Sequence, residues 1–415
     1  MDDLSNSQRP ANEATEKNSR SSTARRNRIL RRAAIVVGVL LFLFYGAGGW
    51  YFSSELASDA FAVDDPDEDS ADDFDLEVVS LQDDRIAFRG QEGGDKDLVT
   101  DGAYGVDLPD GWLHVGALVD ASVQDGYDVA TRVLEFTREM GPAPGTPADF
   151  DSWYHEADPS DLGLPYEDVL FRSALGEFNA WFVPSDADTW AILIHGKGAE
   201  RREGLRLLDS INAAGHPALI INYRNDPGEP RDPSGYYRYG STEWAEVEGA
   251  VRYALDHGAS DVVLVGMSTG AAHALSFFYE SDLADVVAAA IFDSPNIDFG
   301  RTVDYEASQR SLPLLGVQIP QSLTTAAKFI ASLRFDFDWS QHDFIDDADQ
   351  LDFPILVFHG TEDGTVPLDV SERLHEKRPD LVTLVVVDGA EHVQSWNADP
   401  TRYGNEVATF LARAG

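Results

Sequence analysis

Residues 33–52 are twenty consecutive residues without a charge, and this run constrains the architecture of the chain more than any other feature. Twenty helical residues span about 30 Å, the thickness of the hydrocarbon core of a bilayer. The run ends in the aromatic residues 50–52, which suit the headgroup layer, and arginines between Arg25 and Arg32 flank its other end. These features predict one membrane-spanning helix over residues 33–52, with a cytoplasmic N-terminus and the rest of the chain outside the cytoplasm.

A cleaved signal peptide and a buried helix of a soluble protein are the alternatives for this run. Ala60-Phe61-Ala62 has small residues at the spacing of a signal-peptidase site. The long polar segment ahead of the run and the length of the run itself favour an uncleaved anchor.

Charge is distributed unevenly along the chain. Residues 1–52 contain eight basic and four acidic residues, whereas the whole chain of 415 residues contains 31 basic and 73 acidic residues, a net charge of −42. Such an acidic chain repels a phosphate backbone, which argues against nucleic acid as a partner. The chain contains no cysteine, so disulfides, thiolate metal sites and a cysteine nucleophile are excluded.

Composition divides the N-terminal part into segments. Residues 1–32 are polar and rich in arginine and serine, and they predict a disordered basic cytoplasmic tail. Residues 53–75 predict an acidic linker, because the run Asp64–Asp69 lacks the glycine-punctuated spacing of a calcium loop. Residues 76–165 contain short strand-like segments and a helical pattern from Asp128 to Met140, which together predict a small accessory module of mixed α and β structure.

From residue 166 to residue 415, apolar runs alternate with helical patterns. A hairpin is predicted for Tyr166–Ser173 and Glu177–Pro184, followed by buried strands at Trp190–His195, Ala218–Tyr223, Asp261–Gly266, Val286–Phe292, Ile355–His359 and Leu381–Val387. Helices are predicted for Arg202–Ala214, Glu243–His257, Thr269–Tyr279 and Asp369–Lys377. This alternation predicts an α/β domain with a mostly parallel sheet and crossover helices. The long segment 297–350 between two strands predicts a largely helical cap.

The residues Gly266-Met267-Ser268-Thr269-Gly270 follow a predicted strand and precede an alanine-rich helix. This is the context of a nucleophile elbow, in which a serine hydroxyl projects from a tight turn. A serine nucleophile needs a base and an orienting acid, and His392 and Asp363 each follow a predicted strand downstream. Since the carboxyl ends of parallel strands meet at one edge of a sheet, the sequence predicts a catalytic triad of Ser268, Asp363 and His392.

Two other carboxylates compete with Asp363 for the role of the orienting acid. Asp293 also ends a predicted strand, and Glu362 neighbours Asp363. The Ser294-Pro295 sequence after Asp293 suits a turn that enters the cap, so Asp363 is preferred.

Four motifs make residues 166–415 similar to the α/β-hydrolases, of the serine-aminopeptidase-like or prolyl-oligopeptidase-like kind. They are the G-x-S-x-G pattern around Ser268, H-G-x-x-D-x-x-V-P at His359–Pro367, G-x-x-H at Gly389–His392, and Ile194-His195-Gly196. The resemblance implies that the backbone N–H groups of Lys197 and Thr269 form an oxyanion hole. His195 is expected to brace that loop.

These observations predict a membrane-anchored serine hydrolase that cleaves small carboxylic esters, thioesters or short peptides through an acyl-enzyme on Ser268. No cofactor or metal is expected, since His257, His342 and His375 have no partners at metal-ligand spacing. The alternative is a catalytically silent hydrolase-fold domain that binds a cell-envelope partner through residues 76–165. A purely binding domain has no physical need for an intact Ser, Asp and His, which favours the enzyme.

Overall fold

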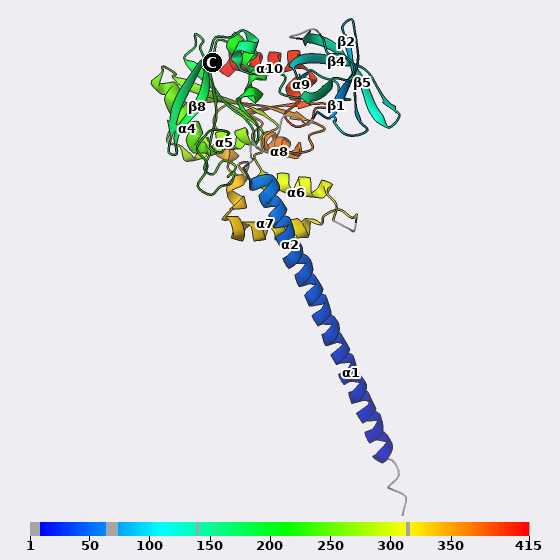
Figure 1. Ribbon diagram of the computed structural model, residues 1–415. Coiled ribbons are helices and arrows are strands. Elements are labelled where there is room, and N and C mark those ends of the chain that lie inside the picture. Colours follow the sequence, from blue (N-terminus) through cyan, green and yellow to red (C-terminus); the bar gives the residue numbers. More distant parts are fainter. Residues whose placement is uncertain (1–8, 64–73, 138–140, 156, 313–315, 415) are drawn as a thin grey trace, which may run out of the picture.

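The computed structural model describes residues 9–63, 74–137, 141–155, 157–312 and 316–414. These residues form a long N-terminal helix, a small barrel of strands, and an α/β domain with a helical cap (Figure 1).

The N-terminal helix continues without a break as far as Phe61. It consists of α1 (Arg9–Phe42), a π-helical segment (Leu43–Gly48), α2 (Gly49–Leu56) and a second π-helical segment (Ala57–Phe61). The part from Arg25 to Phe61 is long and apolar enough to cross a membrane, and its most apolar window is only 6% buried within the protein. Figure 1 shows α1 projecting away from the body of the molecule, which the helix meets through α2.

The structure differs from two predictions for this region. Residues 9–32, predicted as a disordered tail, belong to α1, because no proline or glycine between Pro10 and Gly38 interrupts the helix that contains the apolar run. Residues 53–61, predicted as the start of the linker, continue the same helix. The acidic run Asp64–Asp69 lies outside the described residues.

The accessory module is a closed barrel of antiparallel strands in the order β1-β2-β5-β4-β3-β6. The strands are β1 (Leu76–Gln82), β2 (Arg85–Gln91), β3 (Tyr104–Leu108), β4 (Gly111–Gln124), β5 (Tyr127–Thr137) and β6 (Pro147–Asp151). Its interior is filled by a separate hydrophobic cluster that includes Val78, Phe88 and Leu113.

The helix predicted from Asp128 to Met140 is wrong, because most of this segment forms β5. The β-branched residues Val129, Thr131 and Val133 favour an extended chain, and the alternate residues Ala130 and Arg132 are buried. Within residues 76–165, the described parts contain one short 3-10 helix at Pro159–Leu162 and no α-helix. The module is therefore built from strands rather than from mixed α and β structure.

The α/β domain contains an eight-stranded sheet in the order β14-β13-β12-β11-β9-β10-β8-β7. The strands are β7 (Glu167–Ser173), β8 (Gly176–Val183), β9 (Thr189–Ile194), β10 (Ala218–Ile221), β11 (Asp261–Met267), β12 (Val287–Asp293), β13 (Ile355–Gly360) and β14 (Val382–Val387). β7 and β8 form an antiparallel hairpin at one edge, and the strands from β9 to β14 are parallel. The predicted α/β class is confirmed.

Helices cover both faces of this sheet, because alternate residues of the central strands are apolar on both sides. Ile192 and Ile194 of β9 pack toward α4 (Trp244–Asp256), α5 (Thr269–Glu280) and α8 (Asp369–Lys377). Ala191 and Leu193 pack toward α3 (Leu205–Ala213) and α10 (Pro400–Ala414), which follows the short α9 (Ser395–Ala398).

The cap contains α6 (Phe299–Gln309) and α7 (Gln321–Phe335), and it lies on the side of the body from which α1 leaves (Figure 1). The N-terminal helix and α7 approach closely at two glycines. A Cβ atom on Gly48 would lie 3.2 Å from Leu323 Cδ1, and one on Gly49 would lie 2.9 Å from Ile330 Cδ1. The small residues therefore set the distance between these two helices.

Phe61, at the end of the N-terminal helix, is buried in the core of the α/β domain. Five aromatic rings surround its ring, with centroids 4.9–6.4 Å away: Tyr239, Phe299, Phe335, Phe337 and Trp339. The end of the N-terminal helix is thus part of the folded domain.

Candidate active site

Ser268 occupies a tight turn between β11 and α5, with φ 49° and ψ −115°. Both flanking glycines are required by close backbone contacts. A Cβ atom on Gly266 would lie 2.5 Å from the Ala271 nitrogen, and one on Gly270 would lie 2.1 Å from the Ile194 oxygen. The G-x-S-x-G pattern therefore follows from sterics, and it leaves the serine in a conformation that L-residues adopt at a cost in energy.

The structure brings together the three residues predicted as a triad. The Ser268 hydroxyl lies 2.9 Å from His392 Nε2, and His392 Nδ1 lies 2.8 Å from Asp363 Oδ2. Asp363 follows β13 and His392 follows β14, so both side chains come from the edge of the sheet where β11 ends. The other oxygen of Asp363 accepts hydrogen bonds from the backbone N–H groups of Thr365 and Val366 at 2.9 and 2.8 Å.

The electrostatics of this chain of hydrogen bonds suit a serine nucleophile. Burial would raise the pKa of Asp363, but hydrogen bonds from His359 and His392 outweigh it and hold this pKa well below its usual range. Burial would lower the pKa of His392, but the hydrogen bond and charge of Asp363 raise it above its ordinary value. Asp363 is therefore ionised and accepts from Nδ1–H, which leaves Nε2 to accept the serine proton.

The competing carboxylates do not orient His392. The side chain of Asp293 is buried and accepts a hydrogen bond from Ser395 Oγ at 3.0 Å, and burial raises its pKa to about 6. Its backbone oxygen accepts from Ser268 N at 2.9 Å, so Asp293 supports the turn that carries the serine. Glu362 is exposed.

The loop after β9 lies directly beside Ser268. A Cβ atom on Gly196 would lie 3.2 Å from Ser268 Cβ, and Lys197 and Thr269 line the same cavity as Ser268. Thr269 begins α5, and the first N–H groups of a helix have no acceptor within the helix. The two residues that the resemblance assigns to an oxyanion hole are therefore next to the serine.

A buried network holds this loop in place. His195 Nε2 lies 2.9 Å from Asp226 Oδ2, and His195 Nδ1 lies 2.9 Å from the Gly196 oxygen. Tyr223 OH donates to the Gly196 oxygen at 2.8 Å, and Gly196 N donates to Glu203 Oε2 at 2.8 Å. Both ring nitrogens of His195 face acceptors. Burial would lower the pKa of His195, but the charge and the hydrogen bond of the Asp226 carboxylate raise it above its ordinary value.

Glu203, Tyr223 and Asp226 are not among the site residues predicted from the sequence. A signal for two of them existed, because Tyr223-Arg224-Asn225-Asp226 places polar groups directly after β10, at the edge of the sheet where the other site residues emerge. Glu203 has no such signal, since it lies in a short turn before α3.

The barrel contacts the loop that carries His392. Lys96 Nζ donates to Glu391 Oε1 at 2.8 Å, and Gln394 Nε2 donates to Asp97 Oδ1 at 3.0 Å. These two contacts lie on either side of His392 in the chain. The accessory module therefore helps to fix the position of the histidine.

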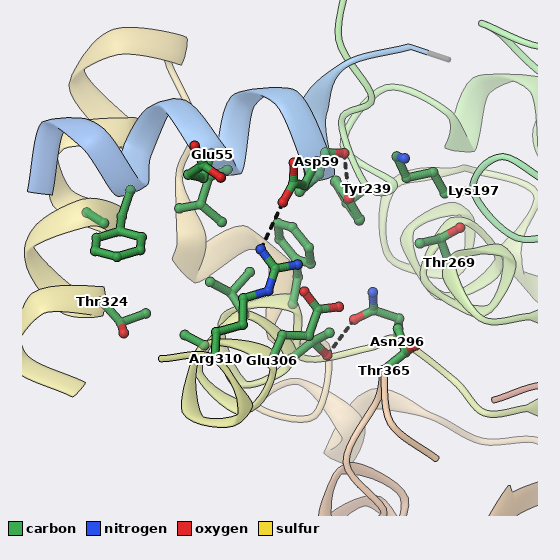
Figure 2. Close-up of a pocket in the computed structure, with 18 of the residues that line it drawn as sticks. Glu55, Asp59, Lys197, Tyr239, Thr269, Asn296, Glu306, Arg310, Thr324 and Thr365 are labelled. Carbon is green, nitrogen blue, oxygen red and sulfur yellow. Dashed lines mark hydrogen bonds and ion pairs between the residues drawn. The ribbon is translucent and has the colours of Figure 1, made fainter. Parts of the chain in front are cut away.

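Two cavities meet at Ser268 and His392. The cap-side cavity has a volume of about 340 Å³, and Figure 2 shows its lining. It is lined from the N-terminal helix by Phe52, Glu55, Leu56, Asp59 and Ala60, from the cap by Phe299, Thr302, Val303, Glu306, Ala307, Arg310, Ile319, Thr324 and Ala327, and elsewhere by Lys197, Tyr239, Ser268, Thr269, Asn296, Thr365 and His392. The barrel-side cavity, about 210 Å³, is lined by Ser152, Trp153, Gly196, Lys197, Gly198, Ala199, Glu203, Arg206, Ser268, His392 and Val393.

The three histidines considered as metal ligands, His257, His342 and His375, contact backbone oxygens instead. His257 Nδ1 lies 2.7 Å from the Tyr253 oxygen, His375 Nδ1 lies 2.8 Å from the Val382 oxygen, and His342 contacts the oxygens of Asp338 and Arg238 at 2.8 and 2.9 Å. Among the residues that the structure describes, no group of three or more His, Asp or Glu side chains is placed to hold a metal ion.

Comparisons with known proteins give the following similarities. No family model matches the chain. The chain is similar to the uncharacterized protein YqkD of Bacillus subtilis (strain 168), with 24% identity over 307 residues that cover 72% of this chain and 96% of that protein. Among solved structures, it is similar to the esterase Pf2001 of Pyrococcus furiosus (19% identity, 62% of this chain and 94% of that chain, TM-score 0.48). It is also similar to the esterase RhEst1 from Rhodococcus sp. ECU1013 (19% identity, 60% of this chain and 99% of that chain, TM-score 0.42).

Proposed function

We propose that the protein is a membrane-anchored serine hydrolase that cleaves carboxylic esters through a covalent acyl-enzyme on Ser268. The observation that carries this proposal is the hydrogen-bonded chain from Asp363 through His392 to Ser268, at a strained turn that faces two cavities. Thioesters and short peptides would react through the same acyl-enzyme.

In the proposed reaction, Ser268 Oγ attacks the carbonyl carbon of the ester while His392 Nε2 takes the hydroxyl proton. The backbone N–H groups of Lys197 and Thr269 stabilise the negative charge on the carbonyl oxygen. The bond to the alcohol then breaks, and His392 gives its proton to the leaving oxygen. Water attacks the acyl-enzyme with the help of His392, which returns a proton to Ser268 Oγ as the carboxylic acid leaves.

Three observations support anchoring by the N-terminal helix. Ile35, Leu40 and Phe42 are exposed, so no part of the described protein covers residues 33–45 of the apolar run. The arginines between Arg25 and Arg32 precede this run and favour a cytoplasmic N-terminus, with the catalytic domain on the other side of the membrane. The burial of Phe61 argues against cleavage at Ala60-Phe61-Ala62, because a cut there would separate the helix from the core into which it packs.

A test of this proposal uses the full-length protein in detergent with a fluorophosphonate probe and p-nitrophenyl acetate. We expect the probe to label the wild type and the ester to be hydrolysed, whereas Ser268→Ala loses both because it lacks the attacking oxygen. Ser276→Ala is a matched control, since this buried serine lies in α5, away from His392. Failure of the folded wild type to react with either reagent would instead favour the silent domain that binds a cell-envelope partner.

A further inference from the structure

We propose that the end of the N-terminal helix is one wall of an acyl-chain site, and that the enzyme therefore acts on long-chain esters supplied by the bilayer. The acyl chain would lie between this helix and the cap, with its carbonyl group at Ser268. This inference rests on the proposed esterase activity and membrane anchoring, and it adds the class of substrate.

The first argument is the spacing of the residues that line the cap-side cavity. Five of them belong to the N-terminal helix: Phe52, Glu55, Leu56, Asp59 and Ala60. They recur every three or four positions, so one continuous face of the helix, about two turns long, faces the cavity. Ser268 and His392 line this same cavity. A segment more than 200 positions away in the sequence thus forms part of the space that a bound substrate would fill.

The cap provides the opposite wall, and five of its nine lining side chains are apolar. Phe299, Val303 and Ala307 follow one another at intervals of four residues on α6, and Ile319 and Ala327 come from the segment that ends in α7. With Phe52 and Leu56 across from them, these side chains offer an apolar surface that suits hydrocarbon.

Charged side chains also line the cavity. Arg310 Nη1 lies 2.9 Å from Asp59 Oδ2, and this ion pair joins the N-terminal helix to the cap (Figure 2). Both side chains are about half exposed, at 54% and 46%, so the pair lies at the boundary with solvent, where charge costs little. Glu306 is less exposed, and burial raises its pKa, which favours the uncharged form of this carboxyl.

Specific contacts fix the position of the helix wall. Arg334 of α7 donates to Ser53 Oγ at 2.5 Å and to Ser54 Oγ at 2.9 Å. Tyr239 OH donates to the Ala60 oxygen at 2.7 Å. The helix is held by hydrogen bonds on both sides of Leu56, so the wall belongs to the folded site.

The position of the cavity along the helix indicates where the acyl chain comes from. Phe52 is both a cavity residue and the last residue of the apolar run, so one end of the cavity lies at the level predicted for the membrane surface. On the cap at this level, Phe329 and Leu333 lie one turn apart on α7 and are 65% and 73% exposed. α7 packs against the N-terminal helix near Gly49, and a bilayer is the partner that would cover the exposed apolar residues of both helices.

The experiment changes the shape of the helix wall and measures chain-length preference. Full-length protein in phosphatidylcholine nanodiscs is assayed with p-nitrophenyl acetate and p-nitrophenyl dodecanoate. In the wild type, kcat/KM should rise with each added CH₂ group that the cavity buries, by about fourfold per group at full burial. Leu56→Trp fills the cavity and should lower the dodecanoate-to-acetate ratio of kcat/KM at least tenfold. Leu56→Ala widens the cavity and should shift the preference toward chains longer than dodecanoate.

The matched control is Ser58→Trp, which introduces the same side chain on the exposed side of the same helix, outside the cavity lining. Its ratio should equal that of the wild type. Because each ratio compares two substrates on one preparation, a lower folded fraction in a variant does not change it. Equal ratios in the wild type, Leu56→Trp, Leu56→Ala and Ser58→Trp would overturn the acyl-chain site while the esterase stands. Absence of hydrolysis and of probe labelling in the wild type would overturn the proposed function itself.

Discussion

Two histidine and aspartate pairs at the same edge of the sheet, His392–Asp363 and His195–Asp226, differ in what the second ring nitrogen meets. His392 contacts Asp363 through Nδ1 and the Ser268 hydroxyl through Nε2. His195 contacts Asp226 through Nε2, and its Nδ1 faces the backbone oxygen of Gly196. The side chain of His392 is 23% exposed, whereas that of His195 is 1% exposed.

This difference shows that a histidine and aspartate pair does not by itself make a site for proton transfer. In the first pair Nε2 lies beside the Ser268 hydroxyl, where the proposed function requires a proton acceptor. In the second pair both nitrogens face acceptors, and the ring holds the loop beside Ser268. The same chemical groups thus suit proton transfer in one place and act as a structural brace in the other.

The largest difference in kcat is expected between two single variants, in which the histidine of one pair or of the other is replaced by glutamine. His392→Gln should lower kcat for p-nitrophenyl acetate by about 10⁶-fold, because the serine loses its base. His195→Gln should lower kcat by at most about 100-fold, through misplacement of the loop. Steady-state kinetics on folded variants measures both values, and equal losses would remove the distinction between the pairs.

The orienting acid should have the next largest effect. Asp363→Asn should lower kcat by about 10⁴-fold, because an amide does not hold the imidazole in the tautomer that accepts the serine proton. Circular dichroism should show an unchanged fold. Asp293→Asn serves as the comparison, since Asp293 does not contact His392 in the described hydrogen bonds. A larger loss in Asp293→Asn would move the acid to that position.

Substitution in the His195–Asp226 pair should change the stability of the protein more than its kcat. Asp226→Asn removes the buried carboxylate that contacts His195 Nε2, which should lower the free energy of unfolding by about 3–5 kcal/mol. Its kcat should fall by at most about 100-fold, for the same reason as in His195→Gln. Denaturant unfolding monitored by tryptophan fluorescence measures the first quantity. An unchanged midpoint would show that Asp226 does not stabilise the loop.

The smallest effect is expected in the pH dependence of kcat/KM, which tests how Asp363 changes the pKa of His392. Protonated His392 cannot accept the serine proton, so kcat/KM should fall about tenfold per pH unit on the acid side. Burial lowers the pKa of His392, but Asp363 raises it more, so the midpoint should lie above the ordinary value of about 6.5. The residual activity of Asp363→Asn should show a midpoint at lower pH. An identical midpoint in both proteins would mean that Asp363 does not set this pKa.

The sequence predicts most of the α/β domain because its strands are continuous apolar runs and its helices are amphipathic. The predicted helix Asp369–Lys377 has the bounds of α8, and every predicted strand of the domain overlaps an observed one. The motif around Asp363 also identifies which carboxylate lies beside His392, because the spacing within one loop is a local property.

The sequence does not predict features that depend on distant contacts. The segment that forms β5 has apolar residues that fit a helix, and pairing with β2 and β4 decides in favour of the strand. Phe52 and Leu56 line the cavity because the helix packs against the cap, and no local pattern in residues 52–60 predicts this. The contact of Glu203 with Gly196 is also not predictable from local sequence, since only the folded loop brings the two residues together.

The burial of Phe61 has a consequence for the order of events during synthesis. Tyr239, whose hydroxyl bonds to Ala60, is 179 positions further along the chain. At about 5–20 residues per second, the ribosome reaches it roughly 10–40 s after it has made the end of the helix. Until then an aromatic side chain destined for the core has no partner, and the apolar run beside it can enter the bilayer first. With the proposed membrane anchor, insertion would precede completion of the site around Ser268, and the pocket would close on a chain that is already anchored.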